Sequence, residues 1–142
     1  MKVIAAAGGC LCGAVQFTYD GELGGKLGAV TICFCAQCRA AQGLGSAVAP
    51  ARAEGLRISQ GVESIAEYES SPGKKRAFCR VCGSPLYSRR DDRPELLRLR
   101  LGALALAPEG LRIEAQIFTE TAPQWTSFGA APRYPGAEAE RS

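Results

Sequence analysis

Three cysteines lie close together in the stretch Cys33-Phe34-Cys35-Ala36-Gln37-Cys38. Two cysteine pairs flank this triplet, at Cys10-Leu11-Cys12 upstream and Cys79-Arg80-Val81-Cys82 downstream, and together they account for all seven cysteines of the chain. The spacings are therefore C-x-C, C-x-C-x2-C and C-x2-C. Short spacings of this kind are typical of metal ligands, because neighbouring thiolates must converge on a single ion.

The length and composition describe an ordinary globular chain. It has 142 residues, of which 46% are hydrophobic and 22% charged, so we expect one domain with a real core. No apolar run approaches the roughly 20 residues of a membrane helix, and residues 1–7 are too short for a signal peptide. We therefore expect a cytoplasmic protein with no membrane partner. Thiols stay reduced in that compartment, so clustered cysteines favour metal binding over disulfides.

The charge balance changes if metal binds. The formal net charge is +3, but seven thiolates and two divalent ions together would bring it to about zero. We therefore expect no nucleic-acid partner on grounds of charge alone. The chain has no histidine, which excludes a cysteine–histidine dyad, a histidine metal ligand and a histidine base.

The two flanking pairs predict a closed structural site. Two C-x-C or C-x2-C turns from distant parts of a chain can place four thiolates around one zinc ion. Gly13 and Gly83 follow the two pairs, and glycine permits the positive φ of a turn whose N–H groups point at sulfur. We predict zinc on Cys10, Cys12, Cys79 and Cys82. The alternatives are buried free thiols or a redox-active C-x2-C motif.

The central triplet predicts a different kind of site. Three ligands leave one position open, which is the pattern of catalytic zinc. We predict a second, more labile zinc on Cys33, Cys35 and Cys38, with these three cysteines as the catalytic residues. The alternatives are one surplus buried thiol, or a disulfide that forms between two of the three in air.

The secondary-structure signals predict a mainly β protein with one short helix. The helix is expected at residues 36–42, directly after the start of the triplet, with Gly43 as its end. Leu97, Leu99 and Leu101 alternate with Arg98 and Arg100, which predicts a half-buried strand with its arginines facing outward. The other expected strands are 14–20, 27–32, 46–49, 56–59, 65–68, 75–78, 86–88 and 111–118. Residues 89–94 are expected to form a charged hairpin tip, and the tail is expected to fray after Tyr134.

Several motifs together resemble one known family. They are Gly9-Cys10-Leu11-Cys12-Gly13-Ala14-Val15, Cys33-Phe34-Cys35-Ala36-Gln37-Cys38-Arg39 with Gly43, Ser70-Ser71-Pro72-Gly73-Lys74 with Arg76, Phe78-Cys79-Arg80-Val81-Cys82-Gly83-Ser84-Pro85-Leu86, Gly102-Ala103-Leu104 and Trp125. The pattern resembles the glutathione-dependent formaldehyde-activating family, which also includes centromere protein V. The likeness runs over a core of about residues 8–125 within a single domain 1–142, leaving a C-terminal tail at 126–142.

The resemblance implies a fold and an activity. It implies antiparallel, β-tent-like sheets pinned by a four-cysteine zinc, a second catalytic zinc on the triplet, and carbon–sulfur lyase chemistry. In such proteins glutathione adds to formaldehyde to give S-hydroxymethylglutathione. The sequence departs from the family at Phe34 and Gln116, where histidines are common, and this leaves the substrate open.

The leading hypothesis is a zinc-dependent enzyme that acts on a small thiol adduct, with glutathione as co-substrate and an aldehyde as partner. Lys74, Lys75, Arg76 and Arg39 are candidates to bind glutathione carboxylates; the alternative is that they are solvated surface charges. Two other functions stay open. One is a non-catalytic zinc-binding or nucleic-acid adaptor module using Arg89, Arg90, Arg98 and Arg100, and the other is a thiol redox sensor using the triplet. The oligomeric state is not predicted.

Overall fold

The computed structural model describes residues 4–137 and shows a mainly β protein with a single α-helix among these residues. Its strands are β1 (Ala6–Gly9), β2 (Gln16–Tyr19), β3 (Thr31–Cys33), β4 (Ser46–Arg52), β5 (Leu56–Gln60), β6 (Ile65–Ser71), β7 (Lys74–Cys79), β8 (Pro85–Arg90), β9 (Arg93–Arg100), β10 (Leu104–Leu106) and β11 (Ala115–Ile117). The helix is α1 (Ala36–Gln42), and 3-10 turns lie at Gly25–Leu27, Ala53–Gly55, Val62–Ser64, Leu101–Ala103 and Thr119–Thr121. Within the described part of the chain, no helix has the length and apolar character needed to cross a membrane.

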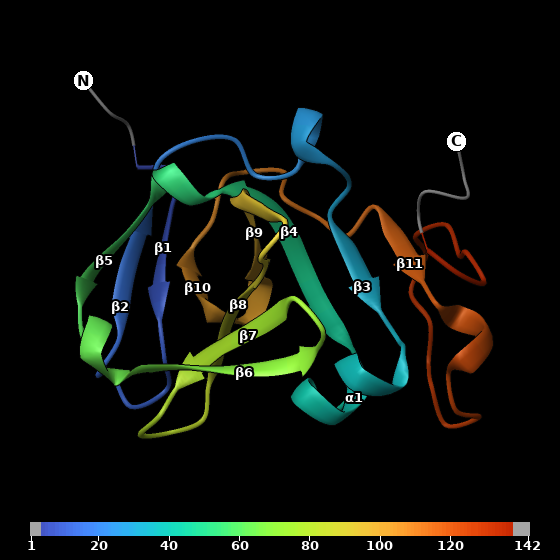
Figure 1. Cartoon of the computed structure of the whole chain (residues 1–142). Coiled ribbons are helices and arrows are strands. Elements are labelled where there is room, and N and C mark those ends of the chain that lie inside the picture. Colours follow the sequence, from blue (N-terminus) through green and yellow to red (C-terminus); the bar gives the residue numbers. More distant parts are fainter. Residues whose placement is uncertain (1–3, 138–142) are drawn as a thin grey trace.

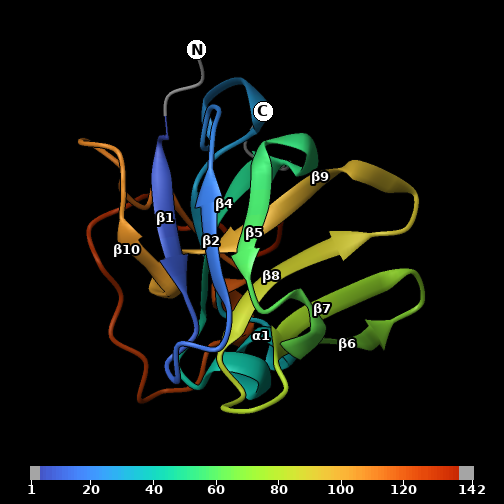
Figure 2. The same ribbon diagram turned by 90° about the vertical axis from the view of Figure 1, so that its left-hand side faces the viewer.

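The strands form two sheets (Figure 1). The smaller has the order β10-β1-β2-β5 and the larger has the order β11-β3-β4-β9-β8-β7-β6. Figure 2 shows β1, β2 and β5 running side by side, while β6, β7 and β8 cross the picture at an angle to them. Neighbouring strands pair antiparallel except for β11, which pairs parallel with β3. The expected antiparallel β architecture is confirmed in outline, with this one parallel edge.

The core fills the space between the two sheets. Its buried members from the smaller sheet and the turn before it are Ala6, Val15, Phe17 and Tyr19, and those from the larger sheet are Ala51, Cys79, Leu86 and Leu99. Burying these apolar side chains removes them from water, which is the main force holding two sheets together. Tyr19 also donates its hydroxyl to the carbonyl of Glu22 and accepts from the N–H of Arg52.

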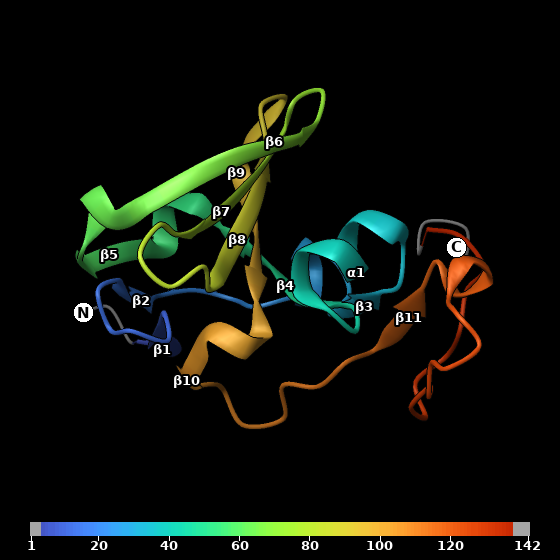
Figure 3. The ribbon, with the colours of Figure 1, turned by 90° about the horizontal axis from the view of Figure 1, so that it is seen from below.

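The helix lies where the sequence predicts it. It begins after Cys35, whose sulfur accepts the N–H of Cys38 at 3.4 Å, and its last turn closes through the N–H of Gly43 to the carbonyl of Arg39. In the view from below, α1 lies beside β3 and β4 (Figure 3). The helix therefore lies directly next to the strand that carries Cys33.

Several predicted strands differ from the observed ones. The strand expected at 27–32 is a 3-10 turn followed by β3, and the one expected at 111–118 shortens to β11. The expected hairpin tip at 89–94 is tighter, because β8 runs to Arg90 and β9 begins at Arg93. The sequence analysis did not predict strands β1 and β10. The Ala- and Gly-rich sequence of β1 lacks a strand signal, and this segment is a strand only because it pairs with β2 and β10.

The expectation that both arginines of β9 face outward is wrong for Arg100. Its side chain is only 3% exposed, although Arg98 is exposed as expected. Alternation places Arg98 and Arg100 on one face of β9 and Leu97 and Leu99 on the other. This arginine face lines a cavity described below, and Arg100 is the buried one of the two arginines.

The C-terminal segment is held by Gln116, which is 2% exposed. Its amide nitrogen donates to the carbonyls of Gly129 and Ala131, at 3.0 and 2.6 Å, and its oxygen accepts the N–H of Gly129. Of the tail expected at 126–142, the part from 138 to 142 lies outside the described residues, as do residues 1–3 at the other end. Residues up to 137 follow the surface beside β11. The expected fraying after Tyr134 is not seen at residues 135 and 136, because their carbonyls accept N–H groups of the turn after β11.

We predict that Gly8→Ala destabilises the fold, because a Cβ at this position would run into the carbonyl oxygen of Ala103 in the neighbouring chain segment. The expected loss is about 2 kcal/mol of unfolding free energy, measured by urea denaturation. Gly102→Ala is the matched control, since nothing lies within 4 Å of a Cβ there. Equal stability of the two variants would contradict this account of the β1–β10 contact.

Candidate metal centres and the adjoining cavity

The seven cysteines gather into two groups in space. Cys10, Cys12, Cys79 and Cys82 form one group, and Cys33, Cys35 and Cys38 form the other; in each, the sulfurs lie within 4.8 Å of one another. Both groups could hold a metal ion. The division into four and three that the spacing predicts is therefore confirmed as an arrangement of thiols, and no disulfide is present among the described residues.

The group of four joins the two sheets. Cys10 and Cys12 lie in the turn from β1 to β2, while Cys79 ends β7 and Cys82 lies in the turn from β7 to β8. The sulfurs of Cys10 and Cys12 are 3.6 Å apart, and those of Cys12 and Cys79 are 3.8 Å apart. These separations match the edge of about 3.8 Å in a tetrahedron with Zn–S bonds of about 2.3 Å.

The turns around this group supply hydrogen bonds to sulfur. The N–H of Val15 donates to Cys10 at 3.2 Å, and the N–H of Val81 donates to Cys79 at 3.4 Å. The Ser84 hydroxyl lies 3.1 Å from the Cys82 sulfur and, together with backbone N–H groups around it, lowers the pKa of that thiol to about 5. The same hydroxyl accepts the N–H of Leu11 from the other turn, so Ser84 connects the two pairs. Gly13 and Gly83 both have positive φ, as expected for such turns.

The triplet is built from the end of β3 and the start of α1. Cys33 ends the strand, Cys35 caps the helix, and Cys38 lies in its first turn. Cys33 and Cys38 are buried, whereas Cys35 is partly exposed. Hydrogen bonding from Cys33, with help from Cys35 and Arg76, lowers the pKa of Cys38 to about 4, while Cys38 and burial raise the pKa of Cys33. These opposite shifts favour the thiolate form at Cys38 and the thiol form at Cys33.

A cavity of about 640 Å³ opens beside the triplet. All three cysteines line it, together with the small buried residues Ser46 and Ser88. Phe118, at its edge, has a left-handed backbone with φ of 55°, an uncommon conformation for a bulky residue. The volume is within the usual range for small-molecule sites.

The four predicted carboxylate-binding residues occupy different places. Lys74 and Arg76 line the cavity, but Lys75 points to the other face of β7, where its Nζ lies 2.6 Å from a carboxylate oxygen of Asp91. Arg39 does not line the cavity; it donates to the carbonyls of Phe34 and Thr121 and so fastens the helix. Alternation along the strand 74–79 was the sequence signal that could have separated Lys75 from its neighbours.

Sequence reasoning missed two further cavity residues, Arg98 and Arg100, because it placed both on an outward surface. Burial, together with the nearby Arg76, lowers the pKa of Arg100 to about 10, and burial lowers the pKa of Lys74. The arginine stripe proposed for a nucleic-acid surface is interrupted, because Arg100 is buried and Arg89 pairs with Glu67 and Asp91. Phe34 packs edge-on against Phe128, with ring centroids 5.2 Å apart, rather than lining the cavity.

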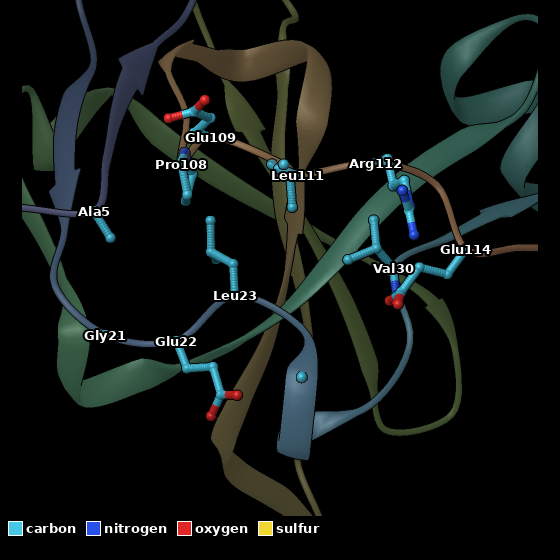
Figure 4. A pocket seen from close by; sticks show the side chains of 12 residues that line it. Ala5, Gly21, Glu22, Leu23, Val30, Pro108, Glu109, Leu111, Arg112 and Glu114 are labelled. Atoms are coloured by element: carbon cyan, nitrogen blue, oxygen red, sulfur yellow. The ribbon is translucent and has the colours of Figure 1, made fainter.

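A second cavity, of about 490 Å³, lies away from the cysteines (Figure 4). Leu23, Leu111 and Pro108 lie near its middle, with the carboxylates of Glu22, Glu109 and Glu114 around it. Glu114 accepts the N–H of Val30 and Glu22 accepts the N–H of Lys26. These carboxylates thus serve the surrounding loops, and the cavity has neither a thiol nor a group of metal ligands.

The fold and the site define a small, mainly β protein with two thiol groups that could bind metal, one of them opening into a cavity. A family model described as glutathione-dependent formaldehyde-activating enzyme matches residues 5–121. The chain therefore belongs to the glutathione-dependent formaldehyde-activating family. It is also similar to a Rhodobacter sphaeroides protein of known crystal structure, at 30% identity and a TM-score of 0.58, covering 75% of this chain and 90% of that one. No curated protein matches it.

We predict that the two cysteine groups contribute unequally to stability. A metal ion held by the group of four would cross-link the two sheets, so Cys12→Ala should lower the melting temperature by roughly 10 °C. Cys35→Ala is the matched control, because the triplet joins only one strand to the adjacent helix, and it should lower the melting temperature by only a few degrees. Scanning calorimetry on anaerobically purified protein makes the comparison; equal losses would contradict the assignment of the bridging role.

Proposed function

We propose that this protein is a zinc-dependent carbon–sulfur lyase that joins the thiol of glutathione to formaldehyde or another small aldehyde, or breaks such an adduct. The observation that carries the proposal is that the triplet opens into a cavity lined by Lys74 and Arg76. A family match to glutathione-dependent formaldehyde-activating enzymes supports the same chemistry. The expected catalytic residues remain Cys33, Cys35 and Cys38.

The donor set fits zinc. All seven donors are thiols, which select soft or borderline ions, and the sulfur separations in the group of four suit a tetrahedral ion. We propose that Cys10, Cys12, Cys79 and Cys82 hold a structural zinc, and that the triplet holds a second one. When bound to the triplet, zinc would supply a Lewis acid that favours the thiolate form of a substrate thiol.

The chain's own residues would bind and orient the substrate. Lys74 and Arg76 carry positive charge at the cavity wall and would hold substrate carboxylates. The Arg76 guanidinium lies 3.8 Å from the Cys38 sulfur, so it would also stabilise negative charge that develops on an aldehyde oxygen next to the triplet. The cavity is lined by no carboxylate among the described residues, and the chain has no histidine, so the thiol proton would leave through solvent.

The adduct is a hemithioacetal. The sulfur electron pair forms the new bond to the aldehyde carbon, and the carbon–oxygen π pair moves to oxygen. That oxygen takes up a proton equivalent to the one released by the thiol, so no oxidant or reductant is required.

We expect two zinc ions per chain in the wild type and one in Cys35→Ser, because the serine variant loses one of only three ligands at the open site. Mass spectrometry of metals on anaerobically purified protein measures both. One zinc in both proteins would mean that the triplet does not hold metal, and the redox-sensor hypothesis would then replace this proposal.

We expect the wild type to accelerate exchange between glutathione, formaldehyde and S-hydroxymethylglutathione, and Cys35→Ser to lose on the order of 100-fold of this acceleration. Exchange spectroscopy by NMR measures the rates at equilibrium. Lys75→Met serves as a control, since its side chain lies on the other face of β7, and should keep the wild-type rate. A wild-type rate equal to the uncatalysed rate would argue against the proposed reaction.

A further inference from the structure

The cavity beside the triplet holds more positive charge than its surroundings neutralise. Its seven lining cations are Lys74, Arg76, Arg89, Arg90, Arg93, Arg98 and Arg100, and no aspartate or glutamate lines it. Arg89, Arg90 and Arg93 each have a carboxylate within 4.0 Å. The other four have no carboxylate partner among residues 4–137. Two of these four, Arg76 and Arg100, are buried. Burying like charges without a counter-charge costs free energy, which indicates an anionic occupant.

Strand register places these four cations around one hollow. Arg76 on β7, Ser88 on β8 and Arg98 on β9 lie opposite one another, so their side chains share one face of the sheet. The small Ser88 side chain separates the two arginines, whose backbones are about 10 Å apart across two strand spacings. Lys74 lies two residues before Arg76 on β7, and Arg100 lies two residues after Arg98 on β9, so they extend this face in opposite directions along the strands. The hollow therefore has cations on both sides and a serine floor.

Arg76 is the cation in contact with the triplet. Its Nη2 lies 3.8 Å from the Cys38 sulfur and its Nε donates to the Ser70 hydroxyl at 3.0 Å. The remaining nitrogen, Nη1, is buried and has no partner, and the residue as a whole is only 9% exposed. A buried guanidinium group left without an acceptor is costly, so this position favours a ligand that supplies one.

The position of Arg76 indicates which part of the substrate it meets. The carboxylates of glutathione lie at the two ends of the tripeptide, many bonds away from its sulfur. We therefore assign them to the lining cations Lys74 and Arg98, which leaves Arg76, a carboxylate-binding candidate above, for a group nearer the sulfur. Arg76 instead contacts a sulfur of the triplet, at 3.8 Å, so a substrate sulfur held at the triplet would bring the carbon bonded to it close to Arg76. In the hemithioacetal, that carbon comes from the aldehyde.

The charge balance of the cavity also indicates a charged group on the aldehyde. Three thiolates with a divalent ion carry one net negative charge, which leaves three of the four unpaired cations uncompensated. Glutathione in its thiolate form brings a net charge of two negatives. One positive charge then remains, and a single carboxylate on the aldehyde would neutralise it.

We propose that the aldehyde joined to the thiol carries a carboxylate on its carbonyl carbon, as in the small 2-oxo acid glyoxylate, and that Arg76 binds this carboxylate. This inference rests on the proposed function, and it replaces formaldehyde with a charged aldehyde of the same reaction. The sulfur attacks the carbonyl carbon, the oxygen takes up the proton, and the carboxylate is unchanged. The guanidinium fork matches a carboxylate in two parallel hydrogen bonds.

The test measures binding of two unreactive glutathione thioethers by titration calorimetry. S-carboxymethylglutathione carries a carboxylate on the carbon bonded to sulfur, and S-carbamoylmethylglutathione carries a neutral amide of the same size. We expect the wild type to bind the carboxylate compound at least about 10-fold more tightly. Arg76→Met should abolish this preference, and Lys75→Met, the neighbouring cation on the opposite face, should keep it.

Circular dichroism establishes that each variant is folded. Arg76→Lys, which keeps the charge but loses the fork, should show an intermediate preference and provides the comparison if Arg76→Met does not fold. Equal affinity of the wild type for the two compounds would overturn the inference and leave the proposed glutathione site intact. Equal weakening of both compounds by the Arg76 variants would also overturn it, because Arg76 would then serve the part that they share. Binding of neither compound would remove the proposed function together with the inference.

Discussion

The structure depends on the meeting of two distant turns. The β1–β2 turn belongs to the smaller sheet and the β7–β8 turn to the larger one, and they bring four sulfurs within 4.8 Å of one another. Hydrogen bonds from Val15 and Val81 to sulfur, and the Ser84 hydroxyl that contacts both turns, hold this arrangement. The core that includes Phe17, Tyr19 and Leu99 lies between the same two sheets. Metal binding here and core packing would therefore act on one contact, so ion affinity would add directly to folding stability.

The larger sheet places acid-paired and unpaired charges on opposite faces of β7 by alternation. On one face of β7, Lys75 pairs with Asp91, close to the Arg89–Glu67 pair, in a solvent-exposed network. On the other face, Lys74 and Arg76 line the cavity with no acid partner among the described residues. Exposed ion pairs contribute little to stability because water screens them. The buried cavity cations Arg76 and Arg100 carry a desolvation cost that the fold must offset, and a bound anion would reduce that cost.

The C-terminal segment completes the side of the triplet that the sheets leave open. Gln116 binds the backbone of Gly129 and Ala131, and Phe34 packs against Phe128, which Arg133 covers at 4.4 Å. Phe34 and Gln116 are the two positions at which the sequence differs from the pattern that it resembles. In this protein both hold the C-terminal segment in place, so neither position contributes a proton-transfer group to the cavity.

Local sequence determined the features that depend only on residues close together in the chain. The cysteine spacings predicted the four-plus-three division, and the helix formers between Cys35 and Gly43 predicted α1 at its observed bounds. The alternation of leucines and arginines predicted β9, because side chains of a strand must face opposite sides. Alternation alone does not show which face of the strand is covered.

Only the tertiary structure decided that Arg100 is buried, that Arg39 fastens the helix, and that β1 is a strand. Each of these outcomes depends on a partner from a distant segment: β4 and the triplet around Arg100, Thr121 at Arg39, and β10 beside β1. Long-range pairing of this kind leaves no local pattern, which is why the cavity and its charge emerged only from the folded chain.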